Sequence, residues 1–140
     1  MHEYRAKVIK IVDGDTVDLD IDLGFDVVLA NQRVRLYGID TPESRTRDAE
    51  EKYYGKLSKQ FLVDYCPVGS NITLKTHLDD ERGKFGRILG ELYVNNVNLN
   101  EQMVEEHLAV PYEGQSKIDI HKANLFIFTN IKIRTNFFIY

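Results

Sequence analysis

The sequence predicts an α+β protein built on a five-stranded Greek-key barrel with two to three α-helices. The first third of the chain contains three segments in which apolar and polar residues alternate, as they do in strands. One helical pattern, two further strand-like segments and a second helical pattern follow. This order, with a helix between the third and fourth strands, is that of the OB-fold. Because the chain has 140 residues, 43% of them apolar, we expect a single domain over residues 1–140.

The three N-terminal segments favour a meander of antiparallel strands. Residues 3–12 are rich in β-branched side chains, and the DGD sequence at 13–15 is typical of a turn. Residues 16–23 alternate strictly, with aliphatic side chains on one face and aspartates on the other, which predicts a half-buried strand. After a turn near Gly24, residues 27–39 are expected to form one long third strand.

The middle of the chain switches to helical spacing. Residues 50–65 are expected to form a helix that ends before Pro67. One face of this helix carries Tyr54, Leu57, Phe61 and Tyr65. Residues 71–78 and 87–94 then read as the fourth and fifth strands, with Ile72 and Leu74 pointing inward from the fourth.

The last predicted helix begins at Asn98. Glu101 follows three residues later, a spacing typical of a capping box. This helix is expected to carry Leu99, Met103 and His107. The C-terminal segment, residues 116–140, is atypical because its second half is rich in Ile, Phe and Asn without a clear period. We leave three interpretations open: an irregular third helix on the barrel, an apolar patch used for association, or a tail altered by a frameshift.

Charge is unevenly distributed along the chain. The net charge of −4 and the pI near 5.5 argue against a protein that coats long duplexes through bulk charge. However, seven of the 18 lysines and arginines fall within residues 33–47 and 82–87. This clustering favours a local basic groove.

The apolar runs, the N-terminal residues and the single cysteine predict where the protein works and the redox state of its thiol. No apolar run approaches the roughly 20 residues of a membrane helix. Residues 1–12 lack the pattern of a signal peptide, so we expect a cytoplasmic protein without membrane contact. The one cysteine, Cys66, has no partner for a disulfide, and we interpret it as a small buried hydrophobe.

The residues that carry chemistry are expected at the ends of strands. Hydrolysis of a phosphodiester requires charge neutralisation at the phosphate, an oriented water and a stabilised leaving oxygen. In a meander, Asp15 and Asp40 would meet at one rim of the barrel, where their carboxylates suit Ca²⁺ or Mg²⁺. Arg35 and Arg87 could pair with a phosphate, and Glu43 follows a proline that limits the movement of its loop.

Taken alone, Asp15 reads as an ordinary turn residue, and the prediction of a site rests on its combination with Asp40 and Glu43. Asp13 is interpreted as a turn residue. Arg33 shares a face with Arg35 but belongs to no motif, so it reads as a solvated charge.

Four motifs together resemble the staphylococcal nuclease (thermonuclease) family. They are VDGDT (12–16), RVRLYGIDTPE (33–43), GKFGR (83–87) and NLNEQMVEEHLAVPY (98–112). Each motif is weak alone, but their order and spacing are specific. The resemblance implies a Ca²⁺-dependent endonuclease that hydrolyses phosphodiester bonds of DNA and RNA. It also implies a preference for single-stranded or frayed substrates and 3′-phosphate products.

The resemblance also implies roles for individual residues. Ca²⁺ would be held by the carboxylates of Asp15 and Asp40 and by the backbone carbonyl of Thr41. Glu43 would act as the general base or position the attacking water. Arg35 and Arg87 would clamp the scissile phosphate.

Substrate contacts are implied for Lys84, Phe85 and Tyr112. Phe85 departs from the tyrosine frequent in the family, so a hydroxyl that could bond phosphate is lost. The aromatic pair that frames the base is reduced to Tyr112. Because stacking on one aromatic ring is worth roughly 1–3 kcal/mol per base, we expect weaker substrate affinity.

Two other functions compete with this prediction. A barrel of the same fold could bind nucleic acid or a peptide without cutting it, but such a protein would be expected to lack at least one of Asp15, Arg35, Asp40, Glu43 and Arg87. A structural component of a phage or plasmid would show no effect of metal on thermal stability. We expect a monomer, with the apolar C-terminal segment leaving association open.

Overall fold

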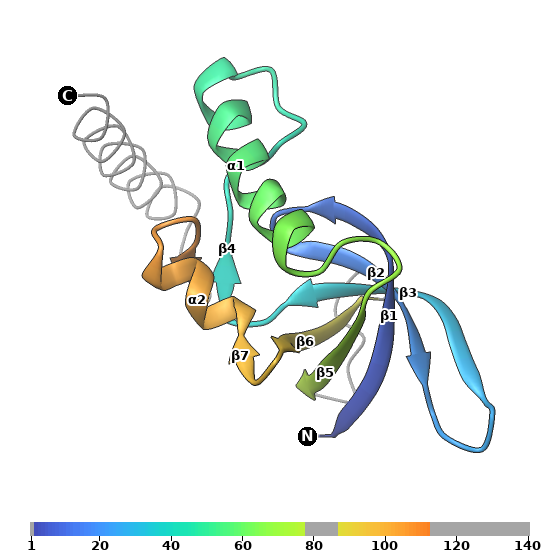
Figure 1. Ribbon diagram of the computed structural model, residues 1–140. Coiled ribbons are helices and arrows are strands. Elements are labelled where there is room, and N and C mark those ends of the chain that lie inside the picture. Colours follow the sequence, from blue (N-terminus) through green and yellow to red (C-terminus); the bar gives the residue numbers. More distant parts are fainter. Residues whose placement is uncertain (1, 78–86, 113–140) are drawn as a thin grey trace.

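The structure is a computed structural model that describes residues 2–77 and 87–112 (Figure 1). Along the chain its elements are β1 (Glu3–Asp13), β2 (Thr16–Asp22), β3 (Val28–Leu36), β4 (Ile39–Asp40), α1 (Ala49–Tyr65), β5 (Asn71–His77), β6 (Ile88–Val94), β7 (Val97–Asn98), α2 (Leu99–Glu105) and β8 (Val110–Pro111). The predictions for Lys84, Phe85 and the segment 116–140 lie outside the described residues. Neither α1 nor α2, the helices of the described ranges, has the length and apolar character needed to cross a membrane.

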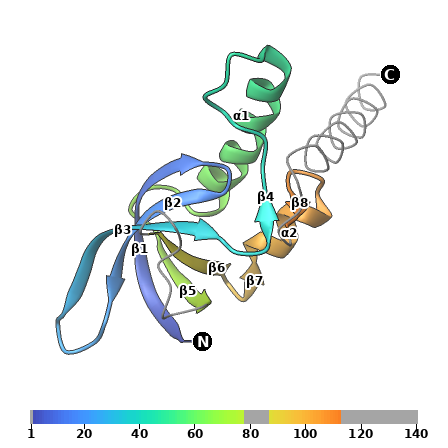
Figure 2. The same cartoon turned by 180° about the vertical axis from the view of Figure 1, so that it is seen from behind.

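Five strands form a closed barrel, as the sequence predicted. β1, β2 and β3 are antiparallel neighbours, and β1 also pairs with β5, which pairs with β6. A parallel pairing of β3 with β6, with Val34 opposite Ile88, closes the barrel. Figures 1 and 2 show α1 and α2 on one side of the barrel, with β4 between them and the β2–β3 hairpin projecting on the other side. The predicted OB-fold class is therefore confirmed.

The core lies inside the barrel and under α1. Alternate residues of each strand point inward, so the aliphatic face of β2 is buried while its aspartates remain outside. Ile72 and Leu74 of β5 are buried as predicted. Cys66 is also buried, and this burial raises the pKa of its thiol to about 11. The cysteine is therefore a packing residue, as its isolation in the sequence suggested.

The predicted third strand over 27–39 is wrong in its last residues. β3 ends at Leu36, and Gly38 has a φ of +78°, a conformation that side chains disfavour. The chain turns there, and β4 leaves the barrel to pair with β8, placing Ile39 opposite Pro111. This break brings Asp40 beside the end of β3 rather than at the tip of a straight strand.

Two helix predictions also need correction. The buried face of α1 consists of Tyr54, Gly55, Ser58, Phe61 and Leu62. Tyr65 is exposed and Leu57 is only half-buried. Gly55 and Ser58 are small, so the backbone of neighbouring segments can approach this face of the helix closely.

The second helix begins as predicted, since Asn98 Oδ1 accepts a hydrogen bond from the Glu101 N–H at 3.1 Å. It ends at Glu105, however, and His107 lies beyond it with a φ of +59°. The predicted helical position of His107 is therefore wrong.

Candidate active site

A guanidinium group joins two carboxylates at one rim of the barrel. Asp15 lies in the turn between β1 and β2, and its carbonyl accepts a hydrogen bond from the Leu36 N–H at 2.8 Å. Arg35, opposite Thr16 in the β2–β3 ladder, places Nη1 3.2 Å from Asp15 Oδ2 and Nη2 3.1 Å from Asp40 Oδ1. The carboxylates thus meet where the predicted meander would bring them, and Arg35 lies between them.

The Arg35 guanidinium retains donors for a ligand. Nη1 also donates to the Leu36 carbonyl at 3.3 Å, so the contacts within the described residues use three of the five N–H groups of a guanidinium. Two N–H groups remain, which is the number that a phosphate needs for bidentate pairing. The side chain is only 14% exposed, so its position is well constrained.

Asp40 carries a perturbed carboxyl group. Burial raises its pKa to about 6, and the negative charge of Asp15 acts in the same direction. Arg35 opposes this shift, while Glu43 adds to it. The single guanidinium of Arg35 does not fully compensate the negative charge of the Asp15 and Asp40 carboxylates. A divalent cation would reduce the negative charge that remains.

The donors at this rim fit a hard cation. The Thr41 N–H donates to Asp15 Oδ2 at 3.3 Å, so the backbone at Thr41 lies against the carboxylate pair. The buried Thr41 Oγ1 has no hydrogen-bond partner among the described residues. Across residues 2–77 and 87–112, no three acidic, histidine or cysteine side chains form a metal cluster. Two carboxylates and one carbonyl would leave the other oxygen positions of Ca²⁺ to water and to substrate.

Sequence reasoning missed a residue that orients Asp15. Thr16 Oγ1 donates to Asp15 Oδ1 at 3.0 Å, which holds the carboxylate with its other oxygen toward Arg35. The threonine directly after the DGD turn was the available signal.

Glu43 lies on an exposed loop that rests on α1. The preceding Pro42 is fully buried and restricts the backbone of this loop. The Glu43 N–H donates to Glu51 Oε1 at 3.3 Å, and Gly55 provides the space that its carbonyl occupies. The negative charge of Glu43 also raises the pKa of Asp40, but less than burial and the charge of Asp15 do.

We expect Gly55→Ala to destabilise the protein and reduce any activity that depends on Glu43. The added Cβ would lie 2.5 Å from the carbonyl oxygen of Glu43. Alanine favours a helix by about 0.5–1 kcal/mol over glycine, but overpacking typically opposes this by about 1–3 kcal/mol. Urea unfolding should therefore show a lower free energy of unfolding, whereas the exposed Lys56→Ala on the same helix should show little change. A more stable Gly55→Ala protein would contradict this account of the loop.

Arg87 and Tyr112 belong to other elements of the barrel. Arg87 immediately precedes β6, the neighbour of β3, and because Arg35 is opposite Leu89, the register places Arg87 level with Arg33 rather than with Arg35. The Tyr112 N–H donates to the Gly38 carbonyl at 2.8 Å, and its ring centroid lies 6.0 Å from Arg35 Cζ. Tyr112 therefore lies beside the guanidinium that we predict to bind phosphate.

Arg33 and Asp13 lie apart from this cluster. Arg33 forms a two-pronged ion pair with Asp18, at 2.9 and 3.2 Å, while its side chain stays 49% exposed, as expected of a solvated strand charge. Asp13 accepts a hydrogen bond from the Gly14 N–H at 2.9 Å and stabilises the turn, as interpreted from the sequence.

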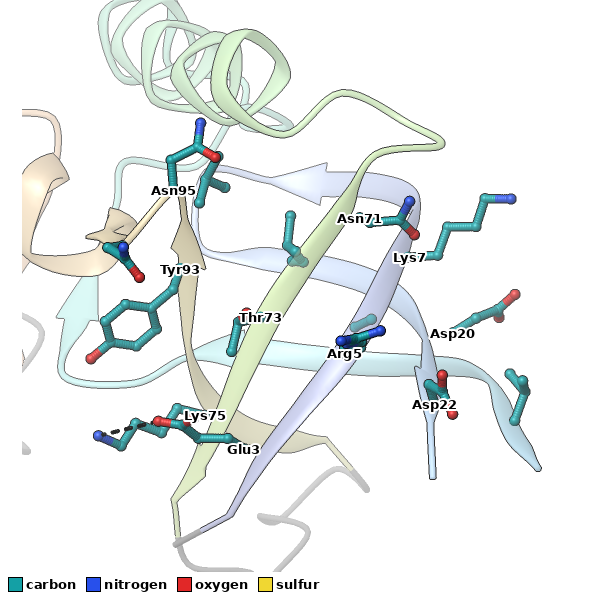
Figure 3. A pocket seen from close by; sticks show the side chains of 15 residues that line it. Glu3, Arg5, Lys7, Asp20, Asp22, Asn71, Thr73, Lys75, Tyr93 and Asn95 are labelled. Carbon is teal, nitrogen blue, oxygen red and sulfur yellow. Dashed lines mark ion pairs between the residues drawn. The ribbon is translucent and has the colours of Figure 1, made fainter. Parts of the chain in front are cut away.

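A groove of about 990 Å³ lies on another part of the barrel surface, across β1 and β5 (Figure 3). Its charged side chains are Arg5, Lys7, Lys75, Glu3, Asp20 and Asp22. Glu3 and Lys75 approach each other to 3.9 Å, and the basic and acidic groups are equal in number. A polyanion gains little from such a balanced surface, so the groove is a weaker candidate for substrate binding than the rim at Arg35.

Fold and site together define a small α+β barrel with two carboxylates joined by one arginine at its rim. The chain belongs to the staphylococcal nuclease family, because the family model described as "Staphylococcal nuclease homologue" matches residues 33–130. The resemblance noted in the sequence is thereby confirmed.

Individual relatives are distant. The chain is 29% identical over 109 residues to a thermonuclease of Staphylococcus hyicus, covering 77% of this chain and 59% of that protein. It is 32% identical over 101 residues to a thermonuclease of Staphylococcus intermedius, covering 71% and 55%. It is 29% identical over 116 residues to endonuclease YhcR of Bacillus subtilis, covering 79% and 9%. The chain thus spans less than two thirds of the length of each of these relatives.

Proposed function

We propose that the protein is a Ca²⁺-dependent endonuclease that hydrolyses phosphodiester bonds in DNA and RNA, with single strands as the preferred substrate. The observation that carries the proposal is the position of Arg35, which holds Asp15 and Asp40 together while two of its N–H groups remain for a phosphate. Membership of the staphylococcal nuclease family and similarity to proteins named as thermonucleases and an endonuclease support a nuclease.

The proposed mechanism assigns a separate task to each part of the rim. Asp15, Asp40 and the Thr41 carbonyl would hold the cation, which supplies positive charge where charge builds up on the phosphate. Arg35 and Arg87 bind the non-bridging oxygens and favour the transition state through preorganised donors. Glu43 orients the attacking water and accepts its proton. The water oxygen bonds to phosphorus and the bond to the 5′ oxygen breaks. The leaving 5′ oxygen takes a proton from solvent, which yields a 3′-phosphate and a 5′-hydroxyl, and Glu43 returns its proton to solvent.

Incubation with heat-denatured DNA tests both the Ca²⁺ dependence and the bond that is cleaved. We expect the protein to cut it with Ca²⁺ present, to stop when EGTA is added, and to leave ends that a 3′-phosphatase converts to 3′-hydroxyls. Duplex DNA of the same sequence should be cut more slowly. Cutting that persists in EGTA would refute the proposed cation, and cutting to 5′-phosphates would refute the proposed bond cleavage.

The non-catalytic alternative predicts a different result in the same experiment. A binding module would shift the melting temperature with Ca²⁺ and a nucleotide bisphosphate but leave the DNA intact. A nuclease should show both the shift and the cleavage, because ligands that bind the folded state stabilise it.

A further inference from the structure

We propose, on the basis of the proposed function, that Tyr37 stacked on His77 is a platform for a nucleobase next to the scissile phosphate. The resemblance in sequence implied Tyr112 as the aromatic residue that frames the base. The barrel brings a second aromatic surface beside the phosphate-binding arginine, formed by side chains from β5 and the end of β3.

Tyr37 is on the same outer face of the barrel as Arg35. Val34 and Leu36 are buried, so the side chains that alternate with them, Arg35 and Tyr37, lie outside. The Tyr37 N–H donates to the Gly90 carbonyl at 2.8 Å, which continues the β3–β6 pairing by one residue. Tyr37 is therefore the next outward side chain after Arg35 along this part of the protein chain.

The backbone of Tyr37 is held by a buried amide. Asn100, which is only 3% exposed, donates through Nδ2 to the Tyr37 carbonyl at 2.9 Å and to the Gly90 carbonyl at 3.1 Å. Its Oδ1 accepts from the Leu92 N–H at 3.2 Å. Both backbone polar groups of Tyr37 are thus bonded, and the ring projects from a rigid position.

His77 supports one face of the tyrosine ring. The two ring centroids are 4.0 Å apart and the planes differ by 8°, which is a parallel stack. His77 Nε2 lies 3.2 Å from Glu91 Oε1 but has no hydrogen-bond partner among the described residues, and the other oxygen of Glu91 accepts from the Tyr93 hydroxyl at 2.9 Å. The parallel stack itself therefore places the histidine ring behind Tyr37.

The open face of Tyr37 is the part available to a ligand. The residue is 41% exposed although His77 covers one side of its ring, so the exposed surface is the other side and the edge. Every base has a π-face, and stacking on rigid aromatic rings is how single strands are bound without sequence preference. With Tyr112 bonded to Gly38, the residue after Tyr37, the two tyrosines would receive bases near the phosphate held by Arg35.

The platform can be tested by binding rather than by cleavage. A labelled single-stranded oligonucleotide is titrated in Ca²⁺ against protein carrying Glu43→Gln, in which we expect cutting to be too slow to deplete the oligonucleotide during the titration, and its fluorescence anisotropy is measured. Adding Tyr37→Ala should raise Kd by about 5- to 150-fold, the loss of one stacked base. Tyr37→Phe, which keeps the π-face, and Tyr53→Ala, which removes an exposed tyrosine on α1, should each stay within about twofold.

A scan with a single abasic position locates the stacked base. One position should weaken binding to the parent protein and have no effect on the Tyr37→Ala protein. Equal affinity of parent and Tyr37→Ala, or the same abasic profile for both, would overturn the platform while leaving the nuclease proposal intact. If the parent protein does not bind the oligonucleotide at all, both proposals fail. Tyr37→Leu, which preserves an apolar contact with His77, replaces Tyr37→Ala if the latter does not fold.

Discussion

Replacing Arg35 by lysine is expected to slow DNA cleavage by roughly two to three orders of magnitude, the usual effect of losing a preorganised donor at a transition state. The guanidinium contacts Asp15 at 3.2 Å, Asp40 at 3.1 Å and the Leu36 carbonyl at 3.3 Å, and still has two donors for phosphate. An ammonium group has three donors on one atom and cannot span these partners and a phosphate together. The measurement is the single-turnover rate on denatured DNA in saturating Ca²⁺.

The matched control is Arg33→Lys. Arg33 lies on the same face of β3, but its guanidinium pairs with Asp18 and its side chain is 49% exposed. Exposed ion pairs contribute little, so this variant should cut at nearly the parent rate. If Arg35→Lys cuts within about fivefold of the parent, or if both variants lose the same activity, the assignment of Arg35 as the phosphate clamp is wrong.

Thermal unfolding separates this effect from loss of structure. Lysine keeps the positive charge between the two carboxylates, so the barrel should remain folded at the assay temperature. A collapse of the melting temperature in Arg35→Lys would mean that the residue serves the fold, and its loss of activity would then say nothing about phosphate binding.

The meeting of Asp15 and Arg35 was predictable because it depends on the meander of neighbouring strands. A turn follows β1, a meander joins β1, β2 and β3, and such strands place their ends at common rims. The alternation of β3 determines which face Arg35 occupies. These are short-range properties that the sequence records directly.

The path of the chain around Asp40 was not predictable to the same degree. The pattern from 27 to 39 reads as one strand, but the chain turns at Gly38 and β4 pairs with β8, about 70 residues further along the chain. The stack of Tyr37 on His77 likewise requires the barrel to close between β3, β6 and β5. Long-range pairing of this kind leaves no period in the sequence.

The face of α1 illustrates a different limit. A hydrophobic pattern selects Tyr65, yet the helix buries Gly55 and Ser58. Ser58 Oγ donates to the Leu108 carbonyl at 2.6 Å, and Gly55 admits the backbone of Glu43. Small residues on a helix indicate its buried face only when the segment that packs on them is known. Here the segment that packs on Gly55 carries Glu43, the proposed general base.

Glu43→Gln is expected to reduce the cleavage rate by about two to four orders of magnitude without weakening DNA binding, because glutamine cannot accept a proton from water. The loop that carries Glu43 should keep its place in this variant, since its contacts with Glu51 and Gly55 involve the backbone. Single-turnover rates and oligonucleotide Kd are measured on the same preparation.

Glu3→Gln, which changes an exposed carboxylate 3.9 Å from Lys75 in the groove, is the control and should alter neither. A rise in Kd that matches the fall in rate would make Glu43 a residue that binds substrate rather than one that acts on water. A Glu43→Gln protein with the parent rate would remove the proposed base from the mechanism, and the proton would have to leave through another group of the rim.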